Sequence, residues 1–125
     1  MSFEWHSSSD RGRGSRGLFV SIDKHQRLCL STALRRELGC LGKPISLYVG
    51  YDKVNRRIAL AKPDVVRLTD TRPYRFDARG YAAARSFVDK FRLPKDRVTR
   101  FYYDGKENGA WTFRMENYDA PDDQI

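Results

Sequence analysis

The chain has 125 residues, with 24 lysines and arginines against 16 aspartates and glutamates, and a formal net charge of +8. Residues 1–62 hold 12 basic and 5 acidic residues, whereas residues 63–125 hold 12 and 11, so the excess positive charge lies in the first half and favours a polyanionic partner. No stretch approaches the roughly 18 apolar residues of a membrane span, and two cysteines are too few for a disulfide framework. These features favour a cytoplasmic protein without membrane contact.

Residues 1–17 form a segment rich in serine, glycine and arginine that is too polar to bury a core. We expect a flexible basic arm there. One interpretation is that Arg11, Arg13 and Arg16 contact the phosphates of DNA, and the alternative is a solubilising tail with no binding role.

Residues 18–63 show the clearest alternation of apolar and polar side chains. Leu18, Val20 and Ile22 alternate along one expected strand, and a short apolar strand over residues 28–30 follows a polar turn. Two further strands, around residues 46–50 and 58–60, would form a hairpin across a turn.

Between these strand pairs the apolar spacing changes to that of a helix. Residues 32–38 place Leu34 and Leu38 on one helical face, and Ser31 or Thr32 can cap the start. Gly39 suits the C-terminal end because glycine readily adopts the left-handed conformation.

The order of strand, turn, strand, short helix and hairpin resembles the swapped-hairpin DNA-binding domain of the AbrB, MazE and SpoVT family. The matching pieces are Asp23 with the turn 24–27, the strand 28–30, the helix Leu34-Arg35-Arg36-Glu37-Leu38-Gly39 and the hairpin 45–63. Gln26 stands where the family usually has glycine, and Ser31 stands where proline is usual.

The resemblance implies an α+β fold in which an AbrB-like β-barrel is built from the swapped hairpins of a homodimer or a higher homo-oligomer. The size of the unit also favours a second copy, because 46 residues of short strands bury little core alone. The family's DNA-facing surface maps onto Arg27, Arg35 and Arg36, with Lys24 adding phosphate contacts. The implied function is a transcriptional regulator of bacterial or phage type that binds double-stranded DNA in the nucleoid.

The second half shows no such resemblance. We expect a connector over residues 64–76, a helix plus β-hairpin unit over 77–116 and an acidic tail over 117–125. Asp77 as N-cap and apolar residues spaced by three and four predict one amphipathic helix over residues 78–92. Strands over 98–103 and 110–115, joined by a turn over 104–109, would make the hairpin.

Aromatic and arginine residues interleave in this hairpin, as they do on surfaces that stack single-stranded nucleic acid. Packing of the aromatic side chains in the core explains most of the pattern. Arg100, Tyr102 and Arg114 lie on the opposite side of their strands and could form a secondary patch for nucleic acid or a protein partner.

Catalytic and metal-binding spacings are absent from the sequence. His6 and His25 have no neighbours that would form a triad or a metal site, and Cys29 and Cys40 lack the spacing of a zinc site. We therefore expect no enzymatic activity, no metal and no cofactor. The alternative to DNA binding is a protein-interaction module, either antitoxin-like or a polymerase-binding factor, that uses the same fold as a scaffold.

Overall fold

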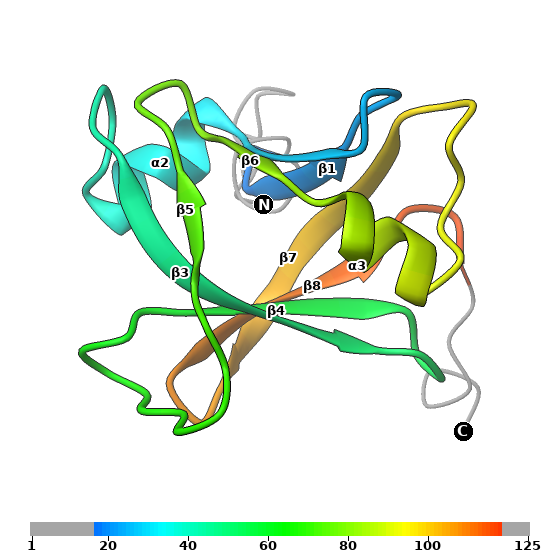
Figure 1. Cartoon of the computed structure of the whole chain (residues 1–125). Coiled ribbons are helices and arrows are strands. Elements are labelled where there is room, and N and C mark those ends of the chain that lie inside the picture. The colour runs from blue at the N-terminus through cyan, green and yellow to red at the C-terminus, as the bar shows by residue number, and fades with distance from the viewer. Residues whose placement is uncertain (1–16, 119–125) are drawn as a thin grey trace, which may run out of the picture.

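The computed structural model describes residues 17–118 as one eight-stranded antiparallel sheet that curves into a nearly closed barrel (Figure 1). The strand order is β5-β3-β4-β8-β7-β1-β2-β6. The two end strands are joined by the turn 77–80, where Asp77 N donates to Tyr81 O at 2.8 Å. The strands are β1 (Phe19–Ile22), β2 (Arg27–Leu30), β3 (Ile45–Asp52), β4 (Arg57–Ala61), β5 (Tyr74–Phe76), β6 (Tyr81–Ala83), β7 (Thr99–Glu107) and β8 (Ala110–Met115). The helices are α2 (Thr32–Leu38) and α3 (Arg85–Lys90).

The barrel interior is apolar and draws on both halves of the chain. Its fully buried side chains include Val20, Ile22 and Leu28 from the first half and Phe101 and Phe113 from the second. The segments 18–63 and 77–116 therefore contribute strands to a single sheet and side chains to a single core.

The elements expected in residues 18–63 are confirmed. Helix α2 begins after Ser31, whose hydroxyl accepts a hydrogen bond from Leu34 N at 3.2 Å, so serine caps the helix where proline is usual in the resembled family. Gly39 ends the helix in the left-handed conformation at φ 74°. Gln26 also adopts positive φ, at 60°, so the turn keeps the conformation that favours glycine despite the larger side chain.

The prediction of one helix over residues 78–92 is wrong in its first part. Residues Tyr81–Ala83 form strand β6, which pairs with β2, and α3 covers only Arg85–Lys90. Asp77 is not a helix cap, since its carboxylate accepts hydrogen bonds from Arg79 N at 2.9 Å and Tyr81 N at 3.0 Å and so closes a tight turn. The helical spacing of the apolar residues was misleading at its first position, Tyr81, because pairing with β2 outweighs the local preference of residues 81–83.

Strand β5 lies inside the segment predicted as a connector. It pairs with β3, and Phe76 is fully buried opposite Ile45. The hairpin of β7 and β8 is also tighter than predicted, because β7 continues to Glu107 and only Asn108 and Gly109, at φ 52° and 84°, form the turn. The extra length is accommodated by a register shift between Tyr103 and Gly105.

The strand pairings repeat with an offset of 54 positions. Ile22 pairs with Thr99 and Phe76 pairs with Ile45, and both 76 − 22 and 99 − 45 equal 54. Each half of the chain thus follows the order strand, strand, helix, strand, strand, and the first hairpin of one half lies beside the last hairpin of the other. The barrel has an internal two-fold relation, and strands from one chain complete it.

Candidate nucleic-acid interface

The turn between β1 and β2 holds Arg27 in place through Asp23. One carboxylate oxygen of Asp23 accepts from His25 N at 2.9 Å and Arg27 N at 3.0 Å, and the other accepts from Arg27 Nε at 2.8 Å. Burial alone would raise the pKa of Asp23, but these hydrogen bonds outweigh it and lower the pKa. The hydrogen bond to Asp23 in turn raises the pKa of Arg27, so the pair is charged on both sides.

Tyr81 lies between two arginines. The Arg27 guanidinium carbon is 4.5 Å from the centre of the Tyr81 ring, and that of Arg79 is 5.1 Å from it. Arg79 forms an exposed ion pair with Asp77 at 3.1 Å, at the position that corresponds to the more buried pair of Arg27 and Asp23. The two halves of the chain therefore place two guanidinium groups against one ring.

Arg35 connects α2 to the turn between β5 and β6. Its Nη1 donates to Ala78 O at 3.4 Å and its Nη2 to Thr32 Oγ1 at 3.3 Å, while its Nε is buried and has no partner within residues 17–118. The side chain passes over Gly80, where an added Cβ would lie 2.7 Å from Arg35 Cδ. Arg35 thus has a structural contact in addition to any binding role.

The other predicted DNA-binding residues differ in their positions. Lys24 and Arg36 are exposed, on the β1–β2 turn and on α2. A pocket of about 420 Å³ between α2 and the outer side of β1, β2 and β6 is lined by Arg35, Arg79 and Tyr81 together with neutral residues of β1 and β2. Arg11, Arg13 and Arg16 lie outside the described residues.

The predicted secondary patch is divided between two environments. Tyr102 and Arg100 both contact Phe19, the first with ring centres 5.7 Å apart and the second with its guanidinium carbon 5.6 Å from the ring centre. Arg114 instead pairs with Asp104 at 3.2 Å. Arg100 and Tyr102 continue the arginine–aromatic surface outward from β1 to β7.

The chemistry of the two cysteines is that of packed side chains. Burial, followed by the charge of Asp23, raises the pKa of Cys29 to about 12, and burial raises that of Cys40. Both thiols are protonated at neutral pH. Over residues 17–118 no group of three histidine, cysteine, aspartate or glutamate side chains is arranged to hold a metal ion, and no helix there has the length and apolar character to span a membrane.

Arg79 and Tyr81 were not predicted as site residues, because the segment was interpreted as a helix. A signal was present in the sequence, since Asp77 and Gly80 stand 54 positions after Asp23 and Gln26 and build the same turn. One shared aspartate is too little to reveal a repeat by eye.

Comparison with known proteins gave no match, whether to family models, to curated proteins or to solved structures.

Proposed function

We propose that the protein binds double-stranded DNA and regulates transcription, through the surface where β2, β6 and α2 meet. The observation that carries the proposal is that the guanidinium groups of Arg27 and Arg79, one from each half of the chain, lie over the Tyr81 ring. Arg35 lines the same pocket as Arg79 and Tyr81. Guanidinium groups suit phosphates and guanine edges because they present a planar fork of donors. Exposed Lys24 and Arg36 would add phosphate contacts.

We further infer that the barrel is a swapped-hairpin barrel of the AbrB type in which two copies of the unit are fused in one chain. The support is the 54-residue offset in the pairings, which places the β7–β8 hairpin against β1 and the β3–β4 hairpin against β5. In a dimer of the resembled kind, a second chain would supply those strands. Here the second half of the same chain supplies them. A location on the nucleoid would follow from the proposed DNA binding.

A gel-shift experiment on genomic fragments tests the proposal. Arg36→Ala should weaken binding without lowering thermal stability, because Arg36 is exposed. Arg35→Ala should weaken binding and also lower stability, since it removes the contacts to Thr32 and the 77–80 turn. Binding should fall with added salt, as neutralised phosphates release counterions.

Arg67→Ala is the matched control, because it removes an exposed arginine from the segment between β4 and β5 and should leave the affinity unchanged. Unaltered DNA binding by an Arg27, Arg36 double alanine variant at moderate salt would contradict the proposed surface. Failure of the unmodified protein to shift any fragment would favour the protein-interaction alternative.

A further inference from the structure

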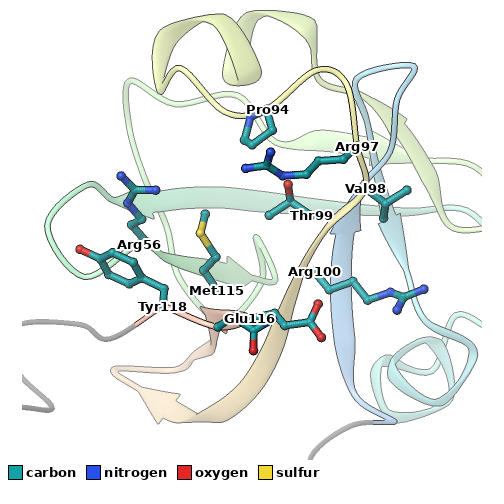
Figure 2. A pocket seen from close by; sticks show the side chains of 10 residues that line it. Arg56, Pro94, Arg97, Val98, Thr99, Arg100, Met115, Glu116 and Tyr118 are labelled. Carbon is teal, nitrogen blue, oxygen red and sulfur yellow. The ribbon is translucent and has the colours of Figure 1, made fainter.

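A second cationic pocket lies at the opposite end of β7 from the β7–β8 turn (Figure 2). It has a volume of about 400 Å³, within the range of small-ligand sites. Its walls come from the β3–β4 turn, the loop between α3 and β7, the start of β7, and the end of β8 with the chain after it. The lining residues are Arg56, Pro94, Arg97, Val98, Thr99, Arg100, Met115, Glu116, Asn117 and Tyr118.

The pocket carries an excess of positive charge. Three of its ten lining residues are arginines and one, Glu116, is acidic. Arg56 stacks on Tyr118, with its guanidinium carbon 4.8 Å from the ring centre. The one ion pair of Arg97 within residues 17–118 is a 3.9 Å contact with Asp96. In Figure 2 the Arg97 guanidinium extends across the pocket between Pro94 and Thr99. Donors of both arginines thus remain available to an anion.

Thr99 presents a second, independent feature of the same pocket. Its hydroxyl oxygen is buried and has no hydrogen-bond partner among the described residues. A buried polar group without a partner costs stability, so a bound group that accepts a hydrogen bond from this hydroxyl would recover that cost.

At two of the lining positions, Thr99 and Arg100, the fold does not need these particular side chains. The positions 54 residues earlier hold Ile45 in place of Thr99 and Ser46 in place of Arg100, and they make the equivalent pairings with β5. The same backbone is therefore built in the other half without the hydroxyl or the arginine.

We propose that this pocket binds a phosphate group carried by a small ligand with a planar apolar part, such as a nucleoside phosphate. Arg56 and Arg97 would hold the phosphate oxygens, and the Thr99 hydroxyl would donate to one of them. Met115, Pro94 and the ring of Tyr118 supply the apolar walls beside the charged groups.

Isothermal titration calorimetry with adenosine monophosphate tests the site, with adenosine as the probe that lacks the phosphate. The nucleotide should bind and adenosine should not. Arg97→Ala should weaken nucleotide binding about tenfold, since it removes a charge-assisted contact. Thr99→Val should weaken it several-fold while the thermal midpoint stays unchanged or rises, because the variant keeps the shape and removes an unpartnered hydroxyl.

Arg85→Ala is the matched control, because Arg85 is exposed on α3 and does not line the pocket. An equal loss of affinity in Arg85→Ala and Arg97→Ala would overturn the proposal, and so would the absence of nucleotide binding up to about 10 mM. If a short DNA duplex displaces the nucleotide, the phosphate that the pocket binds comes from DNA. If the duplex and the nucleotide bind independently, the pocket's ligand is the free nucleotide.

Discussion

Asp104 ties together three strands of the barrel where β7 changes register. Its carboxylate accepts hydrogen bonds from Arg57 Nε at 3.1 Å, from Arg114 Nε at 3.2 Å and from the hydroxyl of Thr112. The side chain is only 12% exposed. Burial alone would raise the pKa of Asp104, but the hydrogen bonds from Thr112, Arg57 and Arg114 outweigh it and lower the pKa.

Asp104→Asn should lower the free energy of unfolding by about 2 kcal/mol at pH 7, because Arg57 and Arg114 lose their charged acceptor. The pKa of Asp104 is lower when folded than when unfolded, so its contribution is fully present above about pH 5 and is lost as the pH falls through the folded pKa. Denaturant unfolding of both proteins at several pH values measures the difference. The control Asp96→Asn, at a side chain 82% exposed, should show almost no difference, and a gap for Asp104→Asn that does not narrow as the pH is lowered would contradict the assignment.

At the scale of secondary-structure elements, the β1–β2 turn and the 77–80 turn each pack against the other half of the chain. Gly80 O accepts from Leu30 N at 2.9 Å, just before α2, and Gln26 O accepts from Ala84 N at 2.9 Å, just before α3. These contacts join the 77–80 turn to the first helix and the β1–β2 turn to the second. Arg35 adds a side chain across the first of the two junctions.

Gly80→Ala should therefore destabilise the protein by more than the cost of positive φ alone. A Cβ at Gly80 would lie 2.7 Å from Arg35 Cδ and 3.2 Å from Leu30 O, at φ 87°. Gly42→Ala is the matched control, since Gly42 has a similar φ of 75° and open space around its Cβ direction. We expect a loss of about 1 kcal/mol at Gly42 and about 2–3 kcal/mol at Gly80 in denaturant unfolding. Equal losses at the two positions would mean that Arg35 and Leu30 move away from the added Cβ at no cost in stability.

The elements that sequence analysis located correctly are those with local signals. Within residues 18–63, β1, β3 and β4 show apolar–polar alternation, β2 is a short apolar run bounded by polar residues, and α2 has both a cap and a terminating glycine. Strands β5 and β6 have three residues each and depend on β3 and β2, which are distant in sequence. Their pairing could not be inferred from periodicity, and Arg79 and Tyr81 were missed as site residues for the same reason.

At the scale of the whole molecule, one reason for expecting a homodimer no longer applies. That prediction depended on a first half too small to bury a core, and the second half now covers it. We expect a folded monomer of 14.6 kDa with one cooperative unfolding transition whose midpoint does not depend on protein concentration. Sedimentation equilibrium and thermal unfolding at several concentrations provide the measurement. A dimer that dissociates only on unfolding would contradict this expectation.

The proposed DNA target should lack two-fold symmetry. Proteins with two-fold symmetry read palindromic sites, but here the positions 54 residues after Arg27, Arg35 and Arg36 hold Tyr81, Asp89 and Lys90. The backbone repeat is thus preserved while the proposed DNA-contacting groups differ between halves. Selection of bound duplexes from a random pool should yield a non-palindromic site. Enrichment of an inverted repeat would contradict the idea that one chain, with its two unlike halves, recognises the site.

The pairing of β1 with β7 also determines when the barrel can form during synthesis. Phe19 lies opposite Tyr102, which the ribosome adds 83 residues later (102 − 19), on the order of ten seconds at ordinary rates of translation. Until then the edge of β1 that pairs with β7 has no partner strand, because only its other edge pairs with β2. The side chains of Val20 and Ile22 then lack the core residues that β7 and β8 supply. A chain that stops before β7 leaves that edge unpaired, so the first strand of the protein is fully paired only after its last hairpin has been made.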